Sequence, residues 1–443
     1  MKHKLVPVAA ALLTALASHN VAAESATDII TDGWEVHGYG SMNFRFNEDL
    51  QSFDSELGKP DYRTAGTSGK SANQIEFVLK KHTEFANGVY SDFVTRTEYG
   101  NGDSFYYTSS GAEKTNTVAQ LEVKEAYVAL GNLPYLGEGT EIWAGRRFLN
   151  RAAGILSGEF WKQSSGMGAG FETNLSSGHK TGIAVVSADP EAGFDAEERP
   201  GDGERTTVTS LDLYYYGVQA LGGSFDFDAK FMTRADEALP RADSADDGFG
   251  VSVTYNRDYY GFDGWTQTAI AYGEGLGSNR GVNFGGWSGD WLEDSKSLFI
   301  TSYGVLNINN NWQLGTEFTY WAPENMDWGA TDGAAKDEVT RYIFAARPTY
   351  KVNDNFRWEF TGSYAVEEVN GSQWGRKDKS TDFYTLEAAS VFTVNADYFG
   401  RPQIKPYVTW VGTNDEAAAG AIGITESGEK DQFVFGVHAE IWF

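Results

Sequence analysis

The sequence predicts an all-β protein, a transmembrane antiparallel β-barrel of about 18 strands. Three observations predict this fold class. The chain begins with a segment that has the features of an export signal, most of the remainder alternates apolar and polar residues over long stretches, and the last such stretch ends on Phe443.

Residues 1–23 have the organisation of a secretory signal peptide. Three cationic or ionisable residues at positions 2–4 precede an apolar run over 5–17, and Val21-Ala22-Ala23 supply small residues before Glu24. A membrane anchor is the rival interpretation, but a spanning helix needs roughly 17 to 25 apolar residues. We therefore expect cleavage after residue 23, which leaves 24–443 as one barrel exported through the periplasm.

The composition of the exported part limits its partners and its chemistry. Removing Lys2 and Lys4 leaves 33 basic against 62 acidic residues, a formal charge of −29, which argues against nucleic acid and anionic lipid as partners. Cysteine is absent, so no disulfide framework or thiolate metal site is available. The 51 glycines, 14% aromatics and only 10 prolines favour many strands with tight turns over helices.

Alternation of apolar and polar residues identifies the strands. In 356–366, one row contains Phe356, Trp358 and Phe360, and the other contains Arg357 and Glu359. One face suits lipid and the other suits water. The same pattern recurs in 312–320 and 225–231. A soluble sandwich also alternates, but its strands are usually about five or six residues long, whereas many of these segments are longer.

We expect strands to begin near residues 34, 73, 88, 120, 140, 167, 179, 205, 222, 247, 265, 296, 312, 338, 355, 382, 402 and 431. Short turns rich in Gly and Asn alternate with long loops, so both termini should lie on one side of the membrane. A barrel of this size encloses an aqueous channel. The last strand places its apolar residues at odd positions from Phe433 to Phe443, as expected for a strand that faces lipid.

Four patches carry a resemblance to the maltoporin-type carbohydrate porins of the bacterial outer membrane. They are His37-Gly38-Tyr39, the run 141–148 with Arg151 and 166–170, Arg347-Pro348-Thr349-Tyr350-Lys351, and the closing Glu440-Ile441-Trp442-Phe443. The resemblance implies a homotrimeric pore embedded in outer-membrane lipids, with the third extracellular loop folded into the pore. It also implies a line of aromatic side chains that carries oligosaccharides past an ionic constriction.

The resemblance places the aromatic slide on five residues: Tyr39, Phe160, Phe284, Phe399 and Trp442. Tyr39 and Trp442 each fall in the polar row of a terminal strand. A position in the aromatic belt at the membrane interface is the alternative for both. Phe160 falls in the third loop, where simple packing is the alternative. Trp287 and Trp291 are alternative candidates for the slide position that is assigned to Phe284 in the sixth loop.

The same resemblance assigns Glu76, Lys124 and Arg151 to the polar constriction. The chain departs from the family pattern elsewhere. Two third-loop aspartates fall on Ala153 and Gly158, Gln74 and Ser41 replace an aromatic and an arginine, and the cysteine pair of the first loop is missing. Loss of carboxylates that accept sugar hydroxyls suggests a sugar range other than, or broader than, maltodextrins. The resemblance does not decide which of Phe105, Tyr106 and Tyr107 is the family's aromatic residue of the second loop.

Two other classes of function compete with a sugar porin. A general diffusion porin would share the barrel but have no specific sugar site. An enzyme is disfavoured, because the sequence contains no His-Glu-x-x-His, Gly-x-Ser-x-Gly or P-loop motif. The six histidines show no metal-binding spacing, so we expect neither a metal nor a cofactor.

Overall fold

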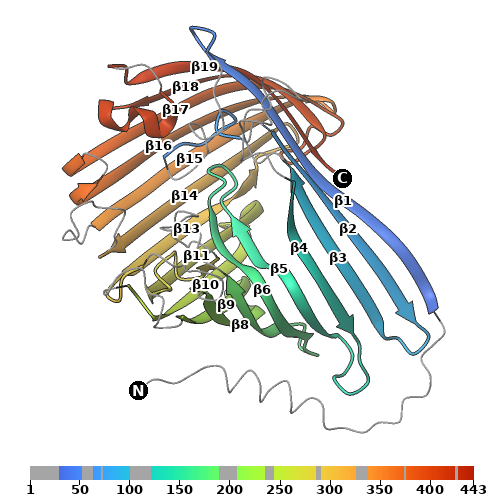
Figure 1. Cartoon of the computed structure of the whole chain (residues 1–443). Coiled ribbons are helices and arrows are strands. Elements are labelled where there is room, and N and C mark those ends of the chain that lie inside the picture. The colour runs from blue at the N-terminus through green and yellow to red at the C-terminus, as the bar shows by residue number, and fades with distance from the viewer. Residues whose placement is uncertain are drawn as a thin grey trace.

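The computed structural model describes residues 29–51, 63–70, 73–99, 121–188, 207–234, 244–285, 291–325, 338–373, 376–424 and 428–443. The signal peptide expected over 1–23 and the aromatics at 105–107 lie outside these residues. Within them, no helix is long and apolar enough to cross a membrane. Figure 1 shows long, tilted strands that follow one another around a single curved wall.

The described residues form eighteen wall strands and one short internal strand, β12 (Asn283–Phe284), which pairs in parallel with β6. The wall strands are β1 (Ile29–Asn47), β2 (Asn73–Phe85), β3 (Tyr90–Tyr99), β4 (Leu121–Gly131), β5 (Thr140–Ala153), β6 (Phe160–Asn174), β7 (Lys180–Ala188), β8 (Val208–Ala220), β9 (Gly223–Arg234), β10 (Asp247–Tyr259), β11 (Phe262–Gly275), β13 (Lys296–Asn307), β14 (Trp312–Glu324), β15 (Glu338–Asn353), β16 (Phe356–Gln373), β17 (Arg376–Thr393), β18 (Gln403–Thr413) and β19 (Asp431–Trp442).

The wall closes by pairing its first strand with its last. Each wall strand is antiparallel to its neighbours, and β1 pairs with β19 from Tyr39↔Trp442 to Asn47↔Val434. The terminal residue extends this seam, because Gly38 N donates to Phe443 O at 2.7 Å and Phe443 N donates to Gly38 O at 3.2 Å. In Figure 1 the blue β1 runs beside the red β19 and continues past the C-terminus. The predicted closed barrel of about 18 strands is confirmed.

Burial alternates along the strands and identifies the inner and outer faces. In β19 the even residues from Gln432 to Glu440 are buried and the odd residues from Phe433 to Val437 are exposed. Aromatic residues of the outer row form two groups, one toward each end of the strands: Tyr364, Tyr384 and Trp410, and Phe356, Trp358 and Phe392. Two such belts around an apolar surface are typical of membrane barrels. The polar row therefore faces the lumen.

The short turns are tight hairpins of the kind that the sequence predicts. Ala220 pairs with Gly223 across two residues, Leu221 and Gly222, whose φ angles are 53° and 78°. Positive φ at both central positions matches the twist of the flanking strands, and glycine adopts it without steric cost. Gly88 and Gly178 take the same region in two other short turns.

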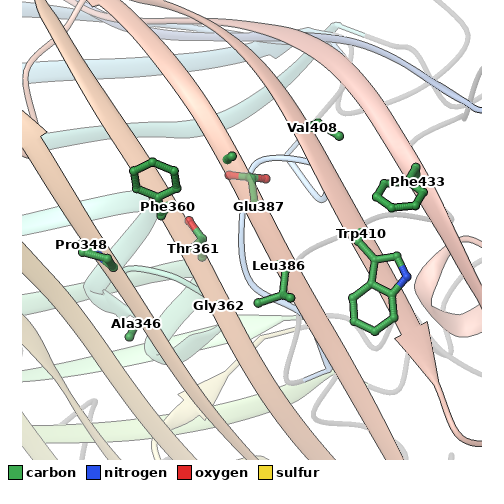
Figure 2. Close-up of a pocket in the computed structure, with 11 residues that line it drawn as sticks. Ala346, Pro348, Phe360, Thr361, Gly362, Leu386, Glu387, Val408, Trp410 and Phe433 are labelled. Carbon is green, nitrogen blue, oxygen red and sulfur yellow. The ribbon is translucent and has the colours of Figure 1, made fainter.

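The outer face of β15–β19 contains a shallow apolar groove of about 870 Å³. Figure 2 shows its lining, in which Phe360, Leu386, Trp410 and Phe433 surround small residues such as Gly362. Phe360 and Leu386 belong to the exposed rows of β16 and β17. The groove therefore lies on the membrane side of the wall and is separate from the lumen.

Most strands begin within three residues of their predicted starts, and three begin five to seven residues earlier than predicted. β1 begins at 29, β6 at 160 and β17 at 376, where 34, 167 and 382 were predicted. The β6 difference has a physical reason. Its first seven residues, Phe160 to Gly166, leave the wall for the interior, so they do not show the alternation of a strand between lipid and water.

Candidate functional site

The inner face of the β1–β19 seam brings two predicted aromatics together. Tyr39 and Trp442 are register partners, and their ring centroids lie 6.4 Å apart at 48°. The hydroxyl of Tyr39 donates to Glu440 Oε1 at 3.3 Å, and Arg401 Nε donates to Glu440 Oε2 at 2.5 Å. Arg401 also lies 5.4 Å from the ring centroid of Trp442. We call Tyr39, Trp442, Glu440 and Arg401 the seam cluster.

Charged residues continue from the seam cluster across β18 and β16. Gln403 donates to Glu440 at 2.8 Å and accepts from Arg357 at 2.8 Å. Glu359 accepts from Arg357 at 2.8 Å and from Lys405 at 2.6 Å. All of these side chains are buried in the lumen-facing rows. Their charged groups therefore bond to partners on neighbouring strands instead of to water.

The predicted constriction residues gather on the other side of the seam. Glu76 is the register partner of Tyr39, and it accepts from Arg96 at 3.0 Å. Arg96 also reaches Glu125 at 2.6 Å, and Lys124 lies 3.6 Å from Glu98. A register shift between β3 and β4 allows both Lys124 and Glu125 to reach the inner face.

Arg151 lies between two aromatic rings near this group. Its guanidinium carbon is 4.3 Å from the ring centroid of Phe160 and 4.6 Å from that of Phe148. Cation–π contact of this kind holds a guanidinium in a fixed plane. Phe160 is 43% exposed, so one face of its ring contacts Arg151 while part of the ring stays accessible.

The tip of the β5–β6 hairpin, residues 154–159, contacts the inner face of β14. Glu317 accepts from Leu156 N at 2.6 Å, from Ser157 N at 3.2 Å and from the Ser157 hydroxyl. Leu156 packs among lumen-facing apolar residues that include Ile343 and Phe383. The carboxyl of Glu317 therefore anchors the hairpin tip to the wall opposite its own strands.

The hairpin and the segment around β12 fill the interior beside β6–β13. Trp161 stacks on Phe299 with ring centroids 6.0 Å apart, and Lys162 donates to Asp228 at 2.6 Å. Phe284 is fully buried in an apolar cluster that includes Trp143 and Tyr214. These contacts pack the hairpin and the segment around β12 against the inner face of β6–β13.

Phe399 lies on the segment that joins β17 to β18, in contact with a tryptophan that the sequence analysis did not single out. The ring centroid of Trp265 is 6.3 Å from that of Phe399 and 6.2 Å from that of Tyr303. Trp265 belongs to the same row of β11 as Gln267, which accepts from the lumen-facing Tyr303. Phe399 and Trp265 are 40% and 37% exposed, so both offer accessible ring surface.

The segment 63–70 of the first loop contacts the inner wall. Glu387 of β17 accepts from Thr67 N at 2.7 Å and from the Thr67 hydroxyl at 2.7 Å, and Arg45 donates to Ser68 O at 2.5 Å. Burial lowers the pKa of Lys70 because its ammonium loses water, while the carboxylate of Glu440 acts in the opposite direction. Lys70 thus lies within electrostatic range of Glu440 in the seam cluster.

The structure brings seven of the eight predicted site residues into three groups in the interior and places Phe284 apart from them. Tyr39 and Trp442 meet at the seam, Phe399 lies two residues before Arg401, and Phe160 contacts Arg151, near Glu76 and Lys124. Phe284 is 0% exposed, so a sugar cannot reach its ring. Trp265 of β11, which the sequence analysis did not single out, has a partly accessible ring beside Phe399. No clear signal in the sequence marks it, because both rows of β11 mix polar and apolar residues.

A closed antiparallel barrel with an apolar outer face, two aromatic belts and a charged, partly filled lumen is an outer-membrane channel. Residues 35–443 match the family model described as LamB porin. The chain therefore belongs to the LamB porin family, whose members are channels and not enzymes.

Relatives support this assignment over most of the chain. A maltoporin of Vibrio cholerae is 24% identical over 389 residues, which cover 78% of this chain and 87% of the relative. A maltoporin of Hahella chejuensis is 24% identical over 448 residues, covering 99% and 98% of the two chains. Among solved structures, Acinetobacter baumannii OccAB4 aligns with a TM-score of 0.48 at 10% identity, covering 95% of this chain and 100% of that one.

Proposed function

We propose that this outer-membrane porin carries oligosaccharides by facilitated diffusion along its lumen-facing aromatics, past the polar groups beside them. The observation that carries the proposal is the set of partly accessible aromatic rings on interior-facing residues. Ring contacts join Tyr39 to Trp442, Arg401 lies over Trp442, and Phe399, two residues before Arg401, contacts Trp265. These two pairs of partly accessible rings, one at the seam and one between β11 and the 394–402 segment, support the proposal.

The chemistry of a sugar suits this arrangement. A pyranose ring has an apolar face that an aromatic side chain can cover, and a rim of hydroxyls that bond well to charged partners. Here the aromatics are accompanied by Glu440, Arg401 and Gln403, which can exchange their mutual hydrogen bonds for bonds to hydroxyls. Each site must bind weakly enough to release its sugar, so several similar sites in line favour transport over retention.

The rest of the proposal concerns assembly and export. The chain is proposed to form a homotrimer in outer-membrane lipids and to lose residues 1–23 during export. The β5–β6 hairpin tip is proposed to narrow the pore as the third extracellular loop, supported by its attachment to Glu317 on the opposite wall. Maltose and maltodextrins are the first candidates because the relatives are named maltoporins.

Single-channel recording in planar bilayers tests the proposal. Reconstituted protein should show current interruptions that become more frequent as maltohexaose, or another oligosaccharide, is added. A conductance that no oligosaccharide interrupts would reject the sugar path and favour the general diffusion porin, with the barrel unchanged.

A further inference from the structure

We propose that residues 414–424, in the loop that joins β18 to β19, position the hairpin tip and thereby help to set the width of the pore. We call these residues the last-loop segment. The inference rests on the proposed role of the hairpin tip as the narrow part of the pore, and it adds a second segment that controls where the tip lies. It comes from an apolar cluster to which both segments contribute.

Three loop segments that are far apart in the sequence meet in this cluster on the inner wall. The wall contributes inward-facing residues of four adjacent strands, β15–β18, among them Ile343 and Phe383. The hairpin tip and the segment 63–70 contribute one buried residue each, and the last-loop segment contributes four. These six loop residues are at most 6% exposed, and they are Ala65, Leu156, Ala418, Ala419, Ile422 and Ile424. We call the whole set the loop cluster.

One side of the last-loop segment faces the loop cluster because the segment is amphipathic. Residues Glu416–Ile422 form a short 3-10 helix. Side chains three residues apart lie on one side of such a helix. Accordingly, Ala419 and Ile422 are both buried, whereas Ala417 and Gly420 are both exposed. The exposed side remains accessible while the buried side packs in the lumen.

Polar contacts fasten both ends of the last-loop segment to the wall. Lys379 Nζ of β17 lies 2.7 Å from Asp415 Oδ1, and the same carboxyl caps the 3-10 helix by accepting from Ala417 N at 3.2 Å. At the other end, Gln432 of β19 donates to Gly423 O at 2.7 Å. The segment is therefore a fixed surface on the inner wall.

The hairpin tip is compact and has two attachments through Leu156. Its backbone closes on itself, since Gly154 N donates to Glu159 O at 3.0 Å and Gly158 N donates to Gly154 O at 3.2 Å. The backbone N of Leu156 donates to Glu317 at 2.6 Å, and its side chain is buried in the loop cluster. One residue thus joins the tip both to β14 and to the cluster that the last-loop segment completes.

The two attachments should depend on each other. A buried side chain keeps its position only while its neighbours stay packed, because protein interiors are close-packed and a void forfeits contacts. If the last-loop segment left the wall, the loop cluster would lose four of its six loop residues. The tip would then rely on Glu317 and on the contact of Glu159 with Arg280. The apolar residues of the last-loop segment are therefore positioning residues, which act on the pore through the tip.

Cysteine accessibility measures this coupling, because the chain has no cysteine of its own. The reagent is a membrane-impermeant thiol label applied to the folded, full-length channel in bilayers. It should modify Ala421→Cys rapidly, since that position is exposed. It should modify Ala419→Cys slowly, because Ala419 is buried and becomes accessible only when the segment leaves the wall.

Glu317→Ala provides the decisive comparison. Coupling between two sites commonly amounts to about fivefold or more, so releasing the tip should speed the modification of Ala419→Cys by at least that factor. The modification of Ala421→Cys should keep its rate. Phe318→Leu is the matched control, because Phe318 follows Glu317 on β14 and its ring contacts the outward-facing Phe344. It should leave both rates unchanged.

Current recordings measure the same coupling from the other side. Ile422→Ala leaves a void in the loop cluster, so spontaneous current steps should become at least about tenfold more frequent. Ala421→Ser, on the exposed side of the helix, should leave the recordings unchanged. If Ile422→Ala does not assemble, Ile422→Val removes one methyl group and should give a smaller increase in the same direction.

The possible failures are distinguishable. Equal modification of Ala419→Cys with and without Glu317 would overturn the coupling. Faster modification with unchanged current in Ile422→Ala and Glu317→Ala would overturn the claim that the coupled segments set the width of the pore. Absence of block by every oligosaccharide would reject the proposed sugar path and leave the coupling of the two segments standing.

Discussion

The rings of Tyr39 and Trp442 meet across the seam at which the first and last strands close the barrel, 6.4 Å apart between centroids. Closure of the wall thus also builds the two-ring platform of the proposed sugar path. Neither ring reaches its place until both ends of the chain are paired.

Removing either ring of this platform should weaken sugar binding. Tyr39→Ala and Trp442→Ala should each raise the maltohexaose concentration that halves the current by about three- to tenfold, since each removes an aromatic face worth roughly 0.5–1.5 kcal/mol beyond its area. Phe44→Ala is the matched control, because Phe44 lies on β1 in the exposed outer row. Unchanged block in both lumen variants would remove these residues from the path.

Trp265 and Phe284 should behave in opposite ways. Trp265→Ala should weaken sugar block about threefold or more and leave thermal stability almost unchanged, because the ring is 37% exposed in the lumen. Phe284→Ala should lower the unfolding temperature, since removing a fully buried phenylalanine costs about 3–5 kcal/mol. Titration of current block and thermal unfolding in detergent measure the two effects. A stable Phe284→Ala channel with lost sugar block would reverse the assignment.

Glu317 should control the rigidity of the hairpin tip. Glu317→Ala removes the acceptor of three hydrogen bonds from Leu156 and Ser157, and each unpaired buried donor costs about 1–3 kcal/mol. The tip should detach from β14, which raises the single-channel conductance and adds current noise. Glu317→Gln keeps one acceptor oxygen and should give an intermediate result. Identical recordings from all three proteins would show that the tip is held by its apolar packing alone.

Gly38 should be essential for seating the C-terminus. A side chain at position 38 would collide with the ring of Phe443 and with Glu76 O, so Gly38→Val should reduce the yield of folded barrel and its resistance to heat in detergent. Gly33→Val on the same strand is the control, because nothing lies near a side chain placed there. Gel mobility with and without heating reports the folded fraction. Equal resistance in the two variants would show that Phe443 can reseat without cost.

The alternation of apolar residues, which face lipid, with polar residues, which face water, made the wall predictable from the sequence. Where one face of a strand meets lipid and the other meets water, as in 312–320 and 356–366, the predicted start of the strand lies within one residue of the observed start. The seam pair was accessible to the same reasoning, since Tyr39 and Trp442 each occupy a polar row.

The interior could not be predicted in this way because its segments meet protein on both sides. The start of β6 was placed too late, and Phe284 was expected on the path although it is packed inside. Trp265 was missed because both rows of β11 mix polar and apolar residues, Gln267 and Ala269 in one and Thr268 and Ile270 in the other. Parity alone does not show which row faces the lumen there.

The pairing of Phe443 with Gly38 has a consequence for biogenesis. A chain that lacks β19 would expose two unpaired strand edges, those of β1 and β18, each with a full row of backbone donors and acceptors. Such edges recruit other chains and lead to aggregation. A nascent or truncated polypeptide therefore needs protection until β19 has been synthesised and paired, and loss of β19 destabilises the closed wall as a whole and not only its own position.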